Sequence, residues 1–299
     1  MTRLVLVSRK SELAMWQSLH VRDLLQMEHP NLQIEVVGVT TKGDRNLESR
    51  LEAIGGKGVF ITELEQMLGE LKADIAVHSM KDVPVSVSPQ FSVCSVGERE
   101  DPADCFVGNQ RLEELPLQSI VGTASLRRKA LLAHLFKRTN VEVARGNVQT
   151  RLKKLDDKVF DGLILASAGL HRLGLQARIQ NRLDPSRFVP SAGQGVLAVQ
   201  YRSDDRSAHE LVSSIQCSVV EDSVTVERSI VAGLGGDCSM ALGVNCTLSS
   251  GVYQLFCAVL NKQGTRAIFL RKCDQSSTQL IETSVEELHK MGAMDLLNE

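Results

Sequence analysis

Short apolar runs alternate with helical segments through the first two thirds of the chain, and this alternation restricts the fold more than any other feature. Leu4–Val7, Ile34–Val39 and Ile75–Val77 have the length and apolar content of buried strands. Two of the segments between them, Ser11–Met27 and Phe60–Leu71, have the apolar spacing of helices. Strands that alternate with helices are typical of α/β sheets, so we predict a first unit of this class.

A second set of alternating elements follows a charged, turn-like segment, Gly97–Pro102. The expected strands are 105–107, 119–121, 141–143 and 162–165, and the expected helices are 126–137, 148–155 and 168–173. This order predicts a second α/β unit with a mainly parallel sheet. Pro190–Gly195 is a second crossing, after which Val196–Tyr201 is expected to return to the first sheet. Two crossings would place a cleft between the two units.

The pattern changes near Cys217, where a helix over Val220–Ala232 precedes three β-like runs and a C-terminal helix. These later elements are expected at 243–248, 252–260, 266–271 and 278–291. We therefore predict an α/β fold of three domains, with two α/β domains around a cleft and a smaller α+β domain. The expected boundaries are residues 1–97 with 195–214, residues 98–194, and residues 215–299.

Composition excludes several classes of protein. The 299 residues carry a net charge of −2, and no apolar run is long enough to span a bilayer. The apolar N-terminal run meets charge again at Arg9, too early for a signal peptide, so we expect a cytoplasmic protein. The seven cysteines are odd in number and lack CxxC spacing, which argues against a disulfide framework and against a metal site.

Polar residues gather where the expected strand Ile75–Val77 ends. They are His78, Ser79, Lys81 and Asp82, and Pro84 then forces an extended exit. Ligands of open α/β sheets bind at the carboxyl ends of strands, so this cluster is a candidate site. The alternative is a polar loop that merely leaves the sheet.

Basic residues are concentrated in residues 122–154, which contain nine Lys or Arg and one acid, a local charge of +8. Some arginines lie near the start of an expected helix, where a cation opposes the helix macrodipole at a cost of about 0.3–1 kcal/mol. The arginines with a ligand-binding interpretation are Arg9, Arg127, Arg145 and Arg151. Helix N–H groups beside a guanidinium favour a carboxylate or phosphate ligand. A solvated surface stays open for Arg128 and is preferred for the nearby lysines. Nucleic acid is a weaker candidate because aromatic residues are only 4%.

One cysteine differs from the other six in its setting. Cys238 follows Gly235 and Gly236, which would let a loop approach another domain closely and present the thiol at its tip. Asp82, beside Lys81 and facing an arginine-rich cleft, would stay ionised and could stabilise a cationic intermediate.

Several motifs occur in an order that resembles the porphobilinogen deaminase (hydroxymethylbilane synthase) family. They are Ser8-Arg9-Lys10-Ser11, Gly55-Gly56-Lys57-Gly58, HSMKDVP over 78–84, GTASLRR over 122–128, Arg145-Gly146-Asn147, AGL over 168–170, RLG over 172–174, GQG over 193–195, and GGDC over 235–238. The resemblance covers nearly the whole chain. It implies three domains, the first two similar to periplasmic binding proteins. It also implies an enzyme that joins four porphobilinogen molecules into linear hydroxymethylbilane and releases ammonia at each step.

The resemblance further implies a dipyrromethane cofactor, held by a thioether to Cys238, and roles for individual residues. Asp82 would contact pyrrole N–H groups and stabilise an azafulvene-like cation. The residues implied to bind the cofactor are Lys81, Thr123, Ser125, Arg127, Arg128, Arg145 and Gly146. Those implied to bind substrate are Arg9, Ser11, Arg145, Arg151, Arg172 and Gln194, with Lys57 on a mobile loop. The chain departs from the family's usual residues at Ala53 and Ala241.

Two alternatives stay open from the sequence. A non-catalytic anion receptor would also have two lobes and a basic cleft, but it has no use for Cys238 or for a third domain. A degenerate family member would carry the cofactor and turn over slowly. We expect an enzyme that acts as a monomer on porphobilinogen, with neither nucleic acid nor a membrane as a partner.

Overall fold

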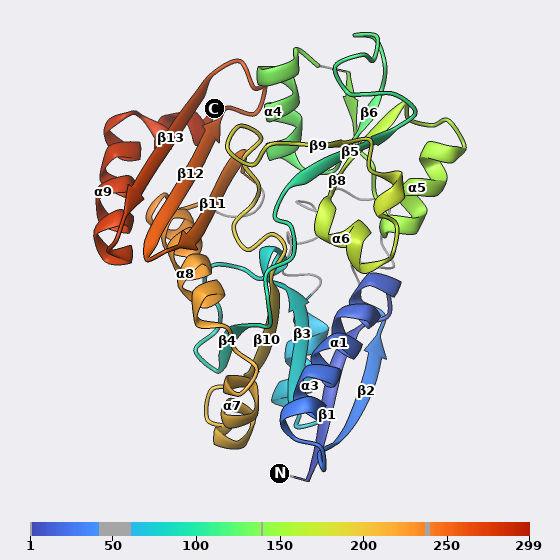
Figure 1. Ribbon diagram of the computed structural model, residues 1–299, viewed down its shortest axis with the longest axis vertical. Coiled ribbons are helices and arrows are strands. Elements are labelled where there is room, and N and C mark those ends of the chain that lie inside the picture. The colour runs from blue at the N-terminus through green and yellow to red at the C-terminus, as the bar shows by residue number, and fades with distance from the viewer. Residues whose placement is uncertain (1, 42–60, 139, 237–239) are drawn as a thin grey trace. The chain divides into compact units, whose positions relative to one another are not determined.

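The computed structural model describes residues 2–41, 61–138, 140–236 and 240–299 (Figure 1). The chain forms two compact units. Unit 1 comprises Met1–Glu100 and Val196–Glu221, and unit 2 comprises Asp101–Gly195 and Asp222–Glu299. The chain therefore crosses between the units near residues 100 and 195, as expected from the two turn-like segments in the sequence. The cleft expected between the first two domains stays a prediction.

Unit 1 contains a five-stranded sheet with the order β2-β1-β3-β10-β4. The strands are β1 (Arg3–Arg9), β2 (Gln33–Val39), β3 (Ile75–Ser79), β4 (Phe91–Val96) and β10 (Leu197–Arg202). β1 pairs in parallel with β2 and β3, whereas β10 is antiparallel to both β3 and β4. The predicted return of the chain to the first sheet after the second crossing is thus confirmed.

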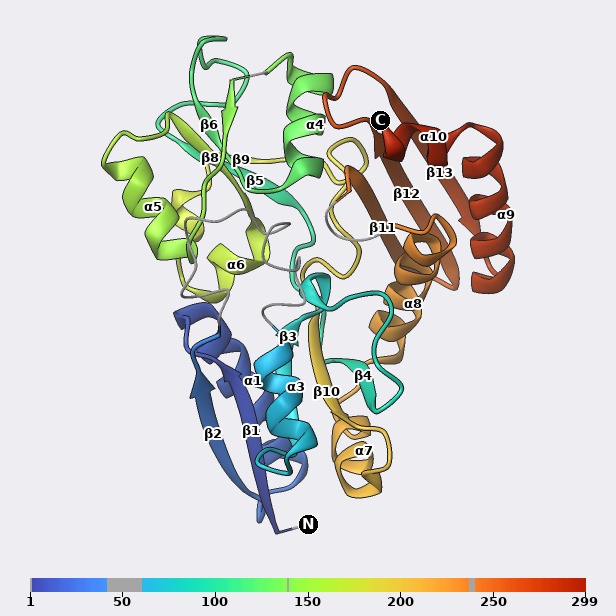
Figure 2. The same ribbon diagram turned by 180° about the vertical axis from the view of Figure 1, so that it is seen from behind.

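Helices cover both faces of this sheet (Figures 1 and 2). They are α1 (Glu12–Glu28), α3 (Thr62–Gly69) and α7 (Arg206–Ser213). Val21 and Leu25 of α1 and Val212 of α7 pack with Leu6 and Val77 in one cluster. On the other face, Leu64 and Leu68 of α3 pack with Val7 and Ala76. Alternate residues of β1 and β3 thus serve opposite cores, as the period of a strand requires.

Unit 2 begins with a second five-stranded sheet, in the order β7-β6-β8-β5-β9. The strands are β5 (Asp104–Gly108), β6 (Val121–Gly122), β7 (Val141–Glu142), β8 (Gly162–Ala166) and β9 (Asn181–Arg182). The prediction of a mainly parallel sheet is confirmed, because β7, β6, β8 and β9 run in one direction and β5 alone of these five strands runs antiparallel to its neighbours β8 and β9. β5 follows the crossing from unit 1, and a strand that enters in this way has no helical crossover to impose parallel direction.

Three helices accompany this sheet: α4 (Leu126–Phe136), α5 (Val148–Asp156) and α6 (Ser167–Arg172). Ser125 caps α4, since its Oγ accepts a hydrogen bond from the Arg128 amide. Asn147 caps α5 in the same way through the Thr150 amide. The caps fix where each helix begins, and therefore which basic side chains stand in its first turn.

The C-terminal part of unit 2 is a three-stranded antiparallel sheet with flanking helices. Its elements are α8 (Ser218–Gly233), β11 (Leu242–Ser249), β12 (Val252–Leu260), β13 (Ala267–Asp274), α9 (Ser277–Lys290) and α10 (Ala293–Asn298). Ala258 and Leu260 of β12 share a core with Leu131 of α4 and with Phe106 of β5. The predicted α+β character is confirmed, and α7, α10 and β9 are elements that the sequence did not predict.

Over the residues that the structure describes, no helix combines the length and the apolar character needed to cross a membrane. The same residues contain no group of three or more His, Cys, Asp or Glu side chains that could hold a metal ion.

The turn between β12 and β13 packs against the backbone of α4. Gly264 adopts a left-handed conformation with φ +69°, and a Cβ built there would lie 2.2 Å from the Ala130 carbonyl oxygen. His134 Nδ1 donates to the Gly264 carbonyl over 3.2 Å. Glycine is therefore required at this turn both by conformation and by close approach.

We expect Gly264→Ala to destabilise the protein more than Gly251→Ala in urea unfolding. Gly251 also has positive φ, +74°, but nothing lies within 4 Å of its missing Cβ. In the control Gly251→Ala, the free energy of unfolding should fall only by the cost of the left-handed conformation, about 1–2 kcal/mol. Gly264→Ala adds the cost of overpacking, about 1–3 kcal/mol. Equal losses in the two variants would show that the contact with Ala130 contributes nothing.

Candidate active site

A tight turn at the end of β3 presents the first group of predicted site residues. β3 leads directly into a 3-10 helix, η3 (Met80–Asp82), in which Lys81 and Asp82 are half-buried. The Met80 amide donates to the Val196 carbonyl over 2.9 Å, and the Val83 amide donates to the Met80 carbonyl over 3.1 Å. Backbone hydrogen bonds therefore hold the turn that carries Asp82 against the residue where the chain re-enters unit 1.

The end of β1 supplies a second group at the same edge of the sheet. β1 and β3 are parallel neighbours, so their carboxyl ends coincide. Arg9 ends β1, and Ser11 caps α1 by accepting from the Ala14 amide over 3.4 Å. Gln17, in the second turn of α1, donates to Ser79 Oγ over 2.9 Å. The structure thus brings the β1–α1 junction to the end of β3, as predicted for Arg9 and Asp82.

His78 lies beneath this edge and is buried. Its Nε2 is 3.0 Å from Oε1 of Gln200 on β10. Burial lowers the pKa of His78 to about 4, while the Gln200 hydrogen bond and the Asp82 charge partly oppose that shift and the Arg9 charge adds to it. The imidazole is therefore neutral near pH 7, and both Asp82 and Arg9 lie within its electrostatic reach.

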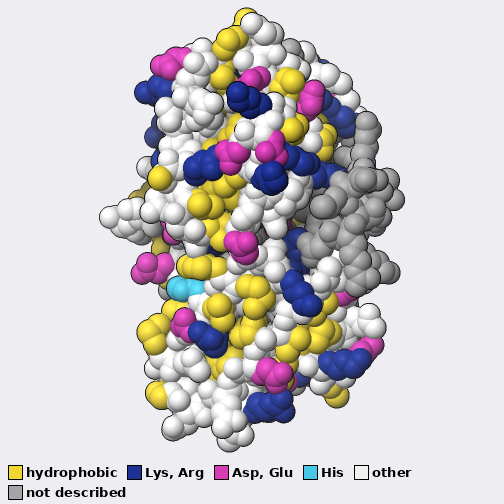
Figure 3. Space-filling view, turned by 90° about the vertical axis from the view of Figure 1, so that its right-hand side faces the viewer, with side chains coloured by type: hydrophobic (Ala, Val, Ile, Leu, Met, Phe, Trp, Pro, Cys, Tyr) yellow, Lys and Arg dark blue, Asp and Glu magenta, His cyan; other side chains and the backbone are white. Residues whose placement is uncertain are grey.

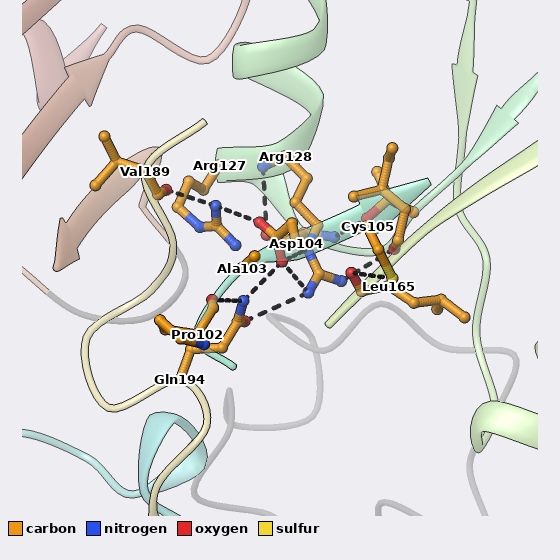
Figure 4. Close-up of polar contacts among 12 residues, drawn as sticks. Pro102, Ala103, Asp104, Cys105, Arg127, Arg128, Leu165, Val189 and Gln194 are labelled. Atoms are coloured by element: carbon orange, nitrogen blue, oxygen red, sulfur yellow. Dashed lines mark hydrogen bonds and ion pairs between the residues drawn. The ribbon is translucent and has the colours of Figure 1, made fainter. Parts of the chain in front are cut away.

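A buried cluster in unit 2 contains the predicted arginines of α4 (Figure 4). Arg128 donates to Asp104 Oδ1 through Nε over 3.0 Å and through Nη2 over 2.7 Å. Arg127 Nη1 lies 2.8 Å from Asp104 Oδ2 and donates to the Val189 carbonyl over 2.7 Å. Arg127 and Arg128 are only 3% and 7% exposed, so the surface alternative for Arg128 is wrong.

The cluster holds one positive charge in excess, because two guanidinium groups share a single carboxylate. Burial alone would raise the pKa of Asp104, but the charges and hydrogen bonds of Arg127 and Arg128 hold it well below its usual range. Arg127 Nε is buried and has no hydrogen-bond partner. On the face drawn in Figure 3, by contrast, exposed basic and acidic side chains are interspersed. An excess charge with an unused donor fits an anionic ligand.

Hydroxyl groups close to these arginines organise the start of α4. The Ser125 amide donates to Thr123 Oγ1 over 3.2 Å, and the Ser125 hydroxyl caps the helix. Thr123 is buried, whereas Ser125 is half-buried. Both predicted residues therefore lie next to the cluster, with at least part of their hydrogen-bonding capacity committed to local backbone.

The third predicted group lies before α5. Gly146 has φ +108°, and a Cβ there would lie 2.7 Å from Thr150 Cγ2. Arg151 Nε donates to the Gly146 carbonyl over 2.7 Å. Arg145 and Arg151 are half-buried. Gly146 thus permits a tight turn before α5, and the hydrogen bond from Arg151 stabilises that turn.

Gln194 and Arg172 connect the second crossing to this unit. Gln194 Nε2 donates to Asp104 Oδ1 over 2.8 Å and to the Pro102 carbonyl over 2.7 Å. Arg172 Nη2 donates to the Gly195 carbonyl over 2.7 Å. Both side chains were predicted to line a substrate site. Gln194 is bonded to the segment through which the chain enters unit 2, and Arg172 is bonded to the residue at which the chain leaves it.

Two predicted residues, Lys57 and Cys238, lie outside the described residues. The other cysteines provide a contrast with the role expected for Cys238. Burial raises the pKa of Cys105 to about 12 and raises that of Cys257 further. Such thiols are poor nucleophiles near neutral pH, because the thiolate is the reactive form.

Sequence reasoning missed Asp104. It begins β5, immediately after the crossing, and its partners lie 23 and 24 residues further along the chain. A single acid at the start of an apolar strand is a weak signal by itself. It gains meaning only from the cation-rich α4, because buried cations require a carboxylate from elsewhere in the sequence.

The fold and these sites define an α/β protein with buried and half-buried cations arranged for a carboxylate-bearing ligand. Residues 4–210 match the family model described as porphobilinogen deaminase, dipyromethane cofactor binding domain. Curated relatives named porphobilinogen deaminase come from Chromobacterium violaceum and Thiobacillus denitrificans. They are 47% and 42% identical, covering 89% and 100% of this chain and 86% and 99% of their own. The chain belongs to the porphobilinogen deaminase family, whose members are dipyrromethane-containing enzymes of tetrapyrrole biosynthesis.

A solved structure with a similar arrangement is the periplasmic aliphatic sulphonate binding protein SsuA from Escherichia coli. It covers 78% of this chain and 70% of its own length, at 10% identity and a TM-score of 0.43.

We expect Asp104→Asn to lower the free energy of unfolding by about 3–5 kcal/mol, because it leaves two buried guanidinium groups without a counter-charge. Asp157→Asn, in an exposed pair with Lys153, is the matched control and should cost less than about 0.5 kcal/mol. The Asp104 contribution is present above pH 3.8 and is lost as pH falls below it, since the folded pKa is lowered. Urea unfolding at pH 7 measures both variants, and similar losses would contradict this account.

Proposed function

We propose that this protein condenses four porphobilinogen molecules into linear hydroxymethylbilane and releases one ammonia for each pyrrole added. The observation that carries the proposal is the Arg127–Arg128–Asp104 cluster, with its excess positive charge and the unpartnered Nε of Arg127. Every pyrrole of this substrate bears acetate and propionate groups. A ligand carboxylate would supply the missing negative charge and an acceptor for the unused donor.

The same cluster fits a dipyrromethane cofactor, because that group also carries carboxylates. When bound, the cofactor supplies the pyrrole carbon to which the first substrate is joined. Cys238 would anchor it through a thioether, an assignment that rests on the GGDC motif. The residues proposed to hold it are Lys81, Thr123, Ser125, Arg127, Arg128, Arg145 and Gly146.

Asp82 is proposed to be the catalytic carboxylate. Loss of ammonia from the aminomethyl carbon of porphobilinogen leaves a cationic, electrophilic methylene. A carbon–carbon bond then forms with the preceding pyrrole, which loses the proton of its reacting carbon. A half-buried carboxylate, held by the backbone hydrogen bonds of η3, is preorganised to stabilise such a cation.

The remaining assignments concern substrate carboxylates and organisation. Substrate is proposed to bind through Arg9, Ser11, Arg145, Arg151, Arg172, Gln194 and Lys57. Residues 98–194 and 215–299, most of which belong to unit 2, are proposed to be separate domains that share a core. The enzyme is proposed to act as a cytoplasmic monomer, without nucleic acid or membrane partners.

Asp82→Asn should keep the shape of the side chain and remove its charge. Electrostatic contributions of this kind are commonly about 3–4 kcal/mol, so turnover of porphobilinogen should fall at least about a hundredfold. The cofactor should remain attached, as measured by intact mass. Asp204→Asn, at an exposed position, is the control. An Asp82 variant within threefold of the unmodified enzyme would remove this residue from the mechanism.

Cys238→Ser should abolish the covalent adduct and nearly all turnover, because a serine hydroxyl is a far weaker nucleophile near neutral pH. Peptide mapping of the denatured protein should find a two-pyrrole adduct on Cys238 alone, stable to thiol reductants. Cys273→Ser, at an exposed thiol, should retain both the adduct and the activity. An unmodified Cys238 in active enzyme, or an adduct on another cysteine, would overturn the assignment.

A further inference from the structure

A chain of polar side chains, buried at His78 and Gln200 and half-buried at Glu65, connects the sheet of unit 1 to α3. Gln200 Nε2 donates to Glu65 Oε1 over 2.7 Å, and His78 Nε2 is 3.0 Å from Gln200 Oε1. His78 pairs with Ala198 and Gln200 with Ala76 in the β3–β10 register, so the two side chains are diagonal neighbours on one face of the sheet. The three residues join α3, β10 and β3 directly below the turn that carries Asp82.

The carboxylate at one end fixes the direction of every hydrogen bond in this chain. A carboxylate only accepts, so the Gln200 amide nitrogen must face Glu65. The amide oxygen then faces His78, and His78 Nε2 must carry the proton. Glu65 therefore selects the Nε2–H tautomer of His78, although Gln200 lies between the two side chains.

A cavity adjoins the hydrogen bond between Glu65 and Gln200. The cavity has a volume of about 150 Å³ and is lined by residues that include Glu65, Gln200, Thr62, Ser86 and Ser88. Its size and hydroxyl groups suit ordered water, which would hydrate the free carboxylate oxygen. One oxygen of Glu65 would thus contact water in the cavity, while the other accepts the hydrogen bond from Gln200.

Among the residues that the structure describes, few charged groups face His78. Asp82 follows it on η3, Arg9 stands at the end of the adjacent β1, and Glu65 reaches it only through Gln200. α1 contributes Gln17, which is bonded to Ser79. A protonated His78 would place a positive charge within reach of the Asp82 carboxylate and weaken its attraction for another cation.

We propose that the Glu65–Gln200–His78 chain is a positioning device for the catalytic turn: it holds His78 as the neutral Nε2–H tautomer, so that His78 fastens the end of β3 and adds no charge beside Asp82. This inference rests on the proposed function, in which Asp82 stabilises a cation. His78, Gln200 and Glu65 are positioning residues and do not contact the reacting atoms.

The test is the charge-swap double variant Glu65→Gln/Gln200→Glu in the full-length holoenzyme. The swap preserves the number of hydrogen bonds and the donation from His78, because the introduced glutamate at position 200 can accept from His78 and from the introduced glutamine. The bond between positions 65 and 200 keeps its two partners but reverses its direction. It moves the negative charge next to the imidazole and thereby favours the imidazolium. Nitrogen–proton correlation spectra of ¹⁵N-histidine-labelled protein, assigned with His78→Gln, report the protonation of both ring nitrogens.

We expect His78 of the unmodified enzyme to show the neutral Nε2–H signature at pH 7, and the swap variant to show a charged ring. Turnover of the swap variant at pH 7 should fall at least tenfold and recover as the pH is raised and the ring loses its proton. A purely structural role predicts wild-type turnover in the swap variant. Wild-type turnover of the swap variant together with a charged His78 would overturn the proposal. An Nδ1–H or charged His78 ring in the unmodified enzyme would overturn it as well.

The single variant Glu65→Gln keeps the proposal testable if the double variant does not fold. With an amide at both positions the direction of the chain is no longer fixed, so both tautomers should appear and turnover should fall severalfold. One unchanged tautomer with unchanged turnover would contradict the proposal. Glu70→Gln, at the exposed C-cap of the same helix, is the matched control and should leave spectrum and turnover unchanged. Intact mass and turnover of the unmodified enzyme test the proposed function separately, because the tautomer of His78 is read without substrate.

Discussion

Two guanidinium groups cannot be buried side by side without negative charge close to both, and much of unit 2 is arranged around this requirement. Asp104 begins the strand that follows the first crossing, while Arg127 and Arg128 stand in the first turn of α4. Gln194, from the second crossing, completes the hydrogen bonding of the same carboxylate. One carboxylate cannot balance two cations, so the folded protein retains a local demand for a further anion. The demand is specific, because planar guanidinium groups match carboxylate geometry.

Unit 1 solves a related problem with an uncharged arrangement. In the proposed function, Asp82 after the end of β3 stabilises positive charge, and a cation below it would weaken that effect. The residue beneath the turn is a histidine that burial keeps neutral, and its hydrogen bond runs through an amide rather than directly to a carboxylate. The interposed Gln200 supplies the directional hydrogen bond while keeping the Glu65 charge one side chain away. The two units therefore differ in their charged groups. The Arg127–Arg128–Asp104 cluster of unit 2 has one positive charge in excess, whereas unit 1 places a neutral histidine below Asp82.

The sequence predicted most elements because apolar periodicity and capping residues are local properties. Ser11 caps α1 and Ser125 caps α4, both over segments expected to be helical, and the strand after the second crossing returns to the first sheet. The sequence did not specify that β5 is the antiparallel strand, because direction depends on where the chain enters a sheet and not on the residues of the strand. Arg9 ends β1 and Asp82 follows β3 at the same edge of the sheet, because these strands are parallel neighbours. Asp104 and the Glu65–Gln200–His78 chain were missed because their partners are distant in sequence and no local pattern marks them.

The crossings give the cationic cluster a further physical consequence. Gln194 bonds to both Pro102 and Asp104, and Arg172 bonds to Gly195, so the segments that leave and re-enter unit 2 are tied to the cluster itself. Gln194 donates to the same Asp104 oxygen that accepts two hydrogen bonds from Arg128. An anion bound to Arg127 or Arg128 would weaken their hydrogen bonds to Asp104 or share the same donors. Either change would alter the strength of the hydrogen bond from Gln194 to Asp104. The carboxylate that positions the arginines is thus also the one that holds Gln194 of the second crossing.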